Sequence, residues 1–179
     1  MFSKDFKEIS AGELISITGG LMAGMILAHI KEELILIPGL LILIPGFLEM
    51  KGNIDGSLSS RLSSALHMGN LLPKIQNSAF LRQNIYATTL LSLIVSIILG
   101  VMALLVTYIY YRVIYIKILY ISIAAVVLSN LILNPITIVT CFWLFKHGHD
   151  PDNIMGPYVT TVGDVISLIS LFIVVAVIA

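Results

Sequence analysis

An acidic residue, Asp164, lies well inside an apolar segment that extends from Ile154 to Ala179. If the segment is helical, a rise of about 1.5 Å per residue places Asp164 roughly 15 Å beyond Ile154. That position is near the middle of a hydrocarbon core roughly 30 Å thick, where an ionised carboxylate costs at least about 2.5–3.5 kcal/mol. Acids at such depth usually face a cavity, a partner or an ion path, so Asp164 is the first candidate functional residue.

Polar neighbours recur around Asp164 at intervals of four, three, four and three residues, which places them on one helical face. They are Asn153, Pro157, Thr160, Asp164 and Ser167. A competing interpretation is that Asp164 is protonated, or bonds a polar residue of another helix for packing alone. The sequence indicates no Lys or Arg at comparable depth in another span, so we expect a mobile cation as its counter-charge.

One Asp164 per chain becomes two in a two-fold homodimer, and two carboxylates balance one divalent ion. Oxygen ligands without thiolates, and without a His pair at depth, suit a hard cation such as Mg²⁺. We therefore expect Asp164, together with Thr160 on the same face, to contact a metal ion.

A second group of oxygen ligands follows the second apolar segment of the chain. Glu49, Asn53 and Asp55 lie beside Gly52 and Gly56, where the missing side chains allow close approach. The competing interpretation is a capped amphipathic surface helix, which explains the serines that follow but not Asn53 and Asp55 together. We expect these three residues to be metal ligands.

The last apolar segment is preceded by "KHGHDPDN". Asp150 is at least as well explained by capping of a helix N-terminus as by recruitment of cations, and for Asp152 both interpretations stay open. His147 and His149 flank a glycine in a loop, a weak indication of a transition-metal site, and we interpret them as solvated residues. Asp152 is retained as a metal-site candidate.

The elements that position these residues are expected to be membrane helices. The chain of 179 residues is 58% hydrophobic and 11% charged, with a mean hydropathy of +1.03, which is typical of a polytopic membrane protein. We predict an all-α integral membrane domain over residues 1–179, without a soluble sensor domain. Its five transmembrane helices are expected at Leu14–Ile30, Leu34–Met50, Ile85–Ile109, Ile118–Phe145 and Ile154–Ala179.

Two Pro-Gly pairs, Pro38-Gly39 and Pro45-Gly46, interrupt the second expected helix. Each proline removes a helical hydrogen bond, and broken membrane helices occur where neighbours or a cavity satisfy the freed backbone. We predict a second helix broken at Pro-Gly near the ion path. A structural kink without function is an equally strong alternative.

Loop charges predict the orientation of the chain in the cell membrane. With a cytoplasmic N-terminus and an external C-terminus, seven Lys and Arg residues face the cytoplasm and three face outside. The cytoplasmic set is Lys4, Lys7, Lys51, Arg61, Lys74, Arg82 and Lys146. The external set is Lys31, Arg112 and Lys117.

Several function classes are disfavoured by the sequence. A formal net charge of zero, with no basic tail, argues against nucleic acid as a partner. The single cysteine, Cys141, excludes an intramolecular disulfide and a cysteine-based metal cluster. "DGSLSSR" resembles the opening of the membrane CDP-alcohol phosphotransferase motif, but its Arg is one residue late and no Asp occurs between Asp55 and Asp150. With no nucleophile–base arrangement either, we do not expect an enzyme.

Two longer segments carry a family resemblance. "IPGFLEMKGNIDGSLSSRLSSALHMG" resembles the proline, lysine-glycine-asparagine and serine-arginine-leucine-serine signature at the end of the second helix in MgtE-type magnesium transporters and channels. "DPDNIMGPYVTTVGDVISL" resembles the signature of their last helix. The two segments are most similar in sequence to the solute-carrier branch of eukaryotes and to related archaeal proteins, and the resemblance spans nearly the whole chain.

This resemblance implies a homodimer whose ion path follows the subunit interface and is lined by the second and fifth helices. Asp164 matches the pore acid that holds a hydrated Mg²⁺, which is the transported ion. Asn53 matches the asparagine of the second-helix motif, and Asp55 an adjacent acidic position of the solute-carrier branch. Asn130 and Asn134 match polar positions near the pore.

The chain departs from its bacterial relatives, which carry large cytoplasmic sensor domains, so we expect that regulation to be absent or supplied by a separate regulatory chain. Eukaryotic relatives join two such units in one polypeptide, and the single unit here favours a homodimer within the lipid bilayer. Two alternatives to a magnesium pore stay open. One is a Na⁺- or H⁺-coupled divalent cation exchanger, and the other is a non-transporting membrane subunit.

Overall fold

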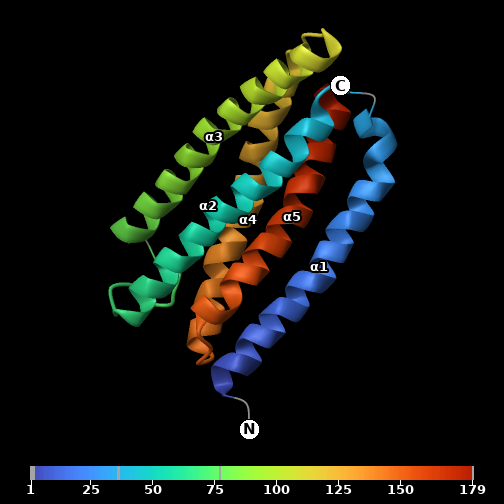
Figure 1. Cartoon of the computed structure of the whole chain (residues 1–179). Helices are drawn as coiled ribbons and strands as arrows, with labels where there is room; N and C mark the ends of the chain where they lie inside the picture. Colours follow the sequence, from blue (N-terminus) through green and yellow to red (C-terminus); the bar gives the residue numbers. More distant parts are fainter. Residues whose placement is uncertain (1–2, 36, 77, 179) are drawn as a thin grey trace.

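The computed structural model describes residues 3–35, 37–76 and 78–178, which form five helices. Their bounds are Lys4–Ile35 for α1, Leu40–His67 for α2, Ala79–Tyr111 for α3, Lys117–Lys146 for α4 and Pro151–Ile178 for α5. The helices run alternately up and down, and the two termini lie at opposite ends of the bundle (Figure 1). The expectation of an all-helical chain with five helices is confirmed.

Four segments in the described residues have the length and apolar composition of membrane spans: Lys4–His29, α3, α4 and α5. The helix α2 is not one of them, because its 28 residues include the charged side chains of Glu49, Lys51, Asp55 and Arg61. The charged residues of α2 therefore lie on a helix that packs against the apolar helices α3, α4 and α5. The chain has the architecture of a multi-pass membrane protein.

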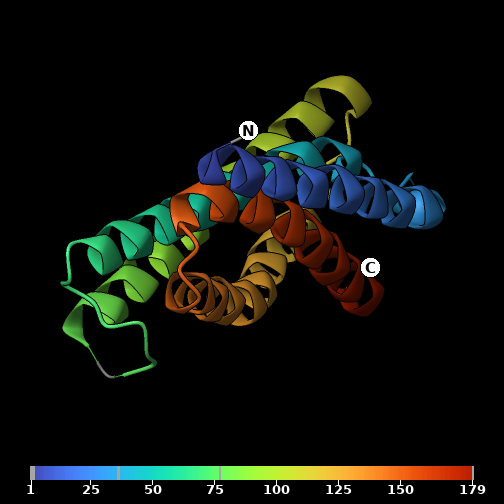
Figure 2. The ribbon, with the colours of Figure 1, turned by 90° about the horizontal axis from the view of Figure 1, so that it is seen from below.

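At the centre of the bundle, α5 packs against α1, α2 and α4, while α3 packs against α2 and α4. Figure 2 shows α5 between α1 and α4. By contrast, α1 barely touches α2. Two buried apolar clusters form the core, one around Phe47 and Leu43 of α2 and the other around Leu58 and Leu62 of the same helix.

Local chemistry explains three of the helix starts. Gly39 precedes α2 with φ of 84°, a left-handed conformation that favours glycine. The side chain of Ser78 accepts a hydrogen bond from the Leu81 amide and caps α3. At α5, Asp150 Oδ1 accepts from the Asp152 amide at 3.0 Å, and Pro151 occupies the first helical position.

The second helix differs from its sequence prediction at both ends. Its expected first residue, Leu34, belongs to α1, and Pro38-Gly39 lies before α2 rather than within it. The helix continues through Pro45 and does not end at Met50 but at His67. It extends so far because leucines at four-residue spacing bury one face in the second apolar cluster, at positions 58, 62 and 66.

Extension of α2 corrects the count of loop charges. Lys51 and Arg61, which the sequence assigned to a cytoplasmic loop, lie within α2. Five of the seven basic residues of the cytoplasmic set remain near helix ends or in loops, so the charge difference that predicts the orientation becomes smaller.

Candidate cation site between α2 and α5

A cavity of about 300 Å³ lies where α2 meets α5. Four of the six residues predicted to bind metal line it, two from each helix. Its lining residues are Pro45, Leu48, Glu49, Gly52, Asn53, Thr160 and Asp164. The structure thus brings together two motifs that lie more than 100 positions apart in the sequence.

The α2 side of the cavity offers a carboxylate and an amide one helical turn apart. Asn53 Nδ2 donates a hydrogen bond to Glu49 Oε1 at 2.9 Å, and both side chains are exposed. This bond uses the amide nitrogen, so the amide oxygen of Asn53 and the second carboxylate oxygen of Glu49 are available as ligands. Oxygen atoms of these two kinds are those that hard divalent cations prefer.

The α5 side offers a hydroxyl and a second carboxylate, again one turn apart. Thr160 Oγ1 donates to the carbonyl of Gly156 at 3.0 Å, which leaves its lone pairs free. Asp164 is half-buried. Within the described part of the chain, no side chain donates a hydrogen bond to Asp164 or forms an ion pair with it, and the nearby charge that acts on it is the negative one of Glu49.

Close helix packing shapes the cavity. A Cβ atom added at Gly52 would lie 3.4 Å from Thr160 Cγ2, so α2 and α5 approach closely enough here to leave space for a methyl group but not for a larger side chain. Pro45, one turn above Glu49, cannot donate a helical hydrogen bond to the carbonyl of Leu41. The cavity wall therefore also includes a stretch of α2 whose backbone bonding is incomplete.

Asp55, the fifth predicted ligand, is not in the cavity. It is fully buried, and its Oδ2 forms an ion pair with Lys51 Nζ at 2.7 Å. Lys51 Nζ also donates to Asn130 Oδ1 at 2.6 Å, and Asn130 Nδ2 donates to Ser92 Oγ at 2.6 Å. These contacts connect α2, α4 and α3 through charged and polar side chains.

The buried ion pair corrects the expectation that no basic residue lies at depth outside the fifth span. Lys51 is such a residue, and Gly52, which follows it, lines the cavity. Its partner is Asp55 rather than Asp164, so Asp164 still has no described basic partner. The four-residue interval between Lys51 and Asp55 is the signal by which the pair could have been found, had the segment been assigned to a helix.

Asp152, the sixth predicted ligand, lies in the first turn of α5, about 18 Å along the helix from Asp164. Its side chain is exposed and lies near His67 and Asp150, with one ligand atom of each of the three within 4.8 Å of the others. His67 Nε2 is 3.2 Å from Asp150 Oδ1. The capping interpretation of Asp150 is confirmed by its bond to the Asp152 amide.

Sequence reasoning missed the contribution of Glu8 on α1. Its carboxylate accepts from Asn153 Nδ2 at 3.1 Å, contacts His149 Nδ1 at 2.9 Å and receives the amide of Asp150 at 3.4 Å. Through its bond to Glu8, Asn153 thus links α5 to α1. Asn153 and the fully buried Ser167 both lie outside the cavity. Of the predicted polar face of α5, the cavity therefore includes Thr160 and Asp164 only.

A family model for MgtE divalent cation transporters matches residues 44–174. The chain belongs to this family. The matched segment contains all six predicted metal-site residues, and it begins just before the Pro45-Gly46 pair.

Curated relatives of this MgtE-family chain include solute carrier family 41 member 2 from Homo sapiens, Mus musculus and Macaca fascicularis. Each is 27% identical over 156 residues, which cover 84% of this chain and 27% of the relative. The chain therefore spans about a quarter of the length of the curated relatives it matches.

Proposed function

We propose that the chain transports divalent cations, Mg²⁺ foremost, across the cell membrane through the cavity between α2 and α5. The observation that carries the proposal is the composition of this cavity in a member of a divalent cation transporter family. Two carboxylates, an amide and a hydroxyl face a common space, and no described basic residue lines it. A cation is the natural counter-charge for such a group.

The size of the cavity suits a hydrated ion. Mg²⁺ prefers octahedral coordination and gives up water reluctantly. Six waters at about 30 Å³ each occupy about 180 Å³. A cavity of about 300 Å³ has room for this shell, with the side-chain oxygens as outer partners. In this proposal Asp164 and Glu49 balance the charge, while Asn53 and Thr160 bond the bound waters.

We propose further that two copies form a homodimer with the cavity at the subunit interface. Glu49, Asn53 and Thr160 are exposed in the single chain, and the weak contact between α1 and α2 leaves space beside the cavity for a partner helix. A second Asp164 facing the first supplies the two carboxylates that neutralise one divalent ion. The N-terminus lies in the cytoplasm and the C-terminus outside, in accordance with the remaining loop charges.

Uptake into proteoliposomes that contain a Mg²⁺-sensitive dye tests transport directly. We expect the purified chain to carry Mg²⁺ down its gradient, and equal signals from protein-containing and protein-free vesicles would refute transport. The dimer is tested by Thr160→Cys in a Cys141→Ser background, oxidised in the membrane. A disulfide-linked dimer is expected, whereas monomers alone would contradict the proposed interface.

The buried Lys51–Asp55 pair favours a second candidate, a Na⁺- or H⁺-coupled exchanger on the same scaffold. Titratable residues buried within a membrane domain often mark proton relays, and this pair lies beside the ion cavity. The uptake assay separates the two candidates, because an exchanger needs an opposing Na⁺ or pH gradient. A Mg²⁺ flux insensitive to both gradients eliminates coupling.

A further inference from the structure

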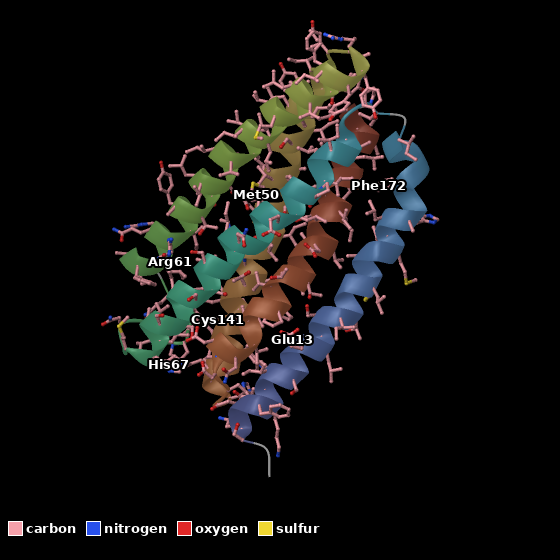
Figure 3. The ribbon with its side chains drawn as sticks, in the orientation of Figure 1. Glu13, Met50, Arg61, His67, Cys141 and Phe172 are labelled. Atoms are coloured by element: carbon pink, nitrogen blue, oxygen red, sulfur yellow. The ribbon has the colours of Figure 1, made fainter. Side chains whose placement is uncertain are left out.

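A second hollow lies between α2 and α3, on a different face of α2 from the cation cavity. It has a volume of about 300 Å³. Ile54, Ser57 and Arg61 line it from α2, and Ala87, Thr88, Leu90, Leu91 and Ile94 line it from α3. We call these eight residues the α2–α3 groove. Figure 3 shows Arg61 on the side of the molecule where α2 and α3 lie together.

The groove contains a permanent positive charge with no acidic partner among the described residues. Arg61 is exposed and forms no hydrogen bond or ion pair with any residue that the structure describes. No acidic residue occurs anywhere between Asp55 and Asp150, so α3 and the segment before it offer none. Asp55 itself is committed to Lys51. A guanidinium cannot lose its charge at any ordinary pH, so Arg61 presents a positive charge to the groove for which the described residues supply no partner.

Apart from Arg61, Ser57 and Thr88, the residues that line the groove are apolar. Leu90, Leu91 and Ile94 are exposed on α3, and Ile54 forms the wall on α2. The seven-residue interval from Ile54 to Arg61 makes the groove about 10 Å long. Ser57 lies one turn from Arg61 and adds a hydroxyl donor at the polar end. An occupant of this groove is therefore anionic at one end and hydrocarbon along the rest.

Arg61 lies near the end of α2. It lies six residues before the last residue of the helix, about 9 Å along its axis. A long basic side chain at this depth extends toward the interface and keeps its charge there. Lys74 and Arg82 lie at the same end of the bundle but do not line the groove.

We propose that the α2–α3 groove binds an anionic phospholipid, with its phosphate held by Arg61 and Ser57 and an acyl chain along the leucines of α3. The planar guanidinium supplies two parallel donors to the phosphate oxygens. This site is independent of the cation cavity, and lipid binding does not require that the chain transport Mg²⁺.

Quenching by brominated lipid tests the proposal with the intact chain in vesicles. Leu91→Trp in a Trp143→Phe background places the sole tryptophan in the groove. Vesicles contain brominated phosphatidylglycerol in unlabelled phosphatidylcholine, or the reverse, and the two quenching curves give the relative binding constant. We expect phosphatidylglycerol to be preferred by about fivefold or more, as one close basic residue predicts.

Two further substitutions in this reporter separate a built site from diffuse attraction. Arg61→Gln is expected to bring the ratio near unity, while the matched control Arg82→Gln, at the same end of the bundle, retains most of it. An excess of inorganic phosphate is expected to leave the quenching unchanged. No preference in the parent reporter, an equal loss in both variants, or displacement by phosphate would each overturn the proposal. If Arg61→Gln fails to fold, Arg61→Lys, which keeps the charge but loses the paired donors, is expected to give an intermediate ratio.

Discussion

The ion pair between Lys51 and Asp55 gives the sharpest energetic prediction of the structure. Both side chains are completely buried, and the two charged atoms are 2.7 Å apart. Removal of one partner from a buried pair leaves an uncompensated charge and typically costs about 3–5 kcal/mol. Lys51→Met adds a further loss, because the Asn130 Oδ1 acceptor loses its donor, which costs about 1–3 kcal/mol.

Replacement of both partners by apolar residues has a different outcome. In the double variant Lys51→Met, Asp55→Val neither charge of the pair remains, and such exchanges are often neutral or stabilising. We therefore expect each single variant to lose about 3 kcal/mol or more of unfolding free energy, and the double variant to lose less than either.

Unfolding in mixed micelles, followed by circular dichroism as the fraction of denaturing detergent increases, measures the three variants against the parent chain. The four free energies form a double-mutant cycle, and its coupling term is expected to be about 3 kcal/mol. Additive losses in the double variant, or single variants within about 0.5 kcal/mol of the parent, would refute a buried charged pair.

Two glycines that face α5 give further predictions. Gly19→Ala is expected to destabilise the fold by about 1–3 kcal/mol, because its Cβ would collide with Thr161 Cγ2. Thr161→Ser removes that methyl group and is expected to restore most of the lost stability in the same unfolding assay. Gly52→Ala is expected to be tolerated, because the added Cβ would lie 3.4 Å from Thr160 Cγ2. Gly52→Val is expected to separate α2 from α5 and to reduce Mg²⁺ uptake. Equal uptake by the two variants would contradict the close approach of the helices.

The sequence predicted the number of helices well because each apolar segment is bounded by strong local signals. Asp150 and Pro151 mark the start of α5 and Ser78 marks that of α3, although these starts were predicted later, at Ile154 and Ile85. The predicted end of α2 at Met50 was wrong because Lys51, Asp55 and several serines make the second half of the helix polar. Those residues are helical because they pack against α3, α4 and α5, and local composition carries no information on that packing.

The candidate site was predictable in part for a similar reason. Asp164 and Thr160 follow from helical spacing alone, and so do Glu49 and Asn53 as a neighbouring pair. Their proximity across α2 and α5 was implied by the family resemblance, not by spacing. Asp55 was assigned to the metal site because it lies near Glu49 and Asn53 in the sequence and matches an acidic position of the family. Its pairing with Lys51 was missed because Lys51 was placed in a loop, and the bond from Lys51 to Asn130 joins residues 79 positions apart.

Mg²⁺ uptake by Asp164→Asn tests the central proposal most directly. This substitution keeps the size of the side chain and removes its charge, while Asp152→Asn makes the same change at the exposed start of α5 and serves as the matched control. With equal amounts of folded protein in proteoliposomes, we expect Asp164→Asn to lower the initial uptake rate by about tenfold or more, which corresponds to about 1.4 kcal/mol, and Asp152→Asn to stay within about twofold of the parent. Uptake by Asp164→Asn at the parent rate would contradict a cation path between α2 and α5.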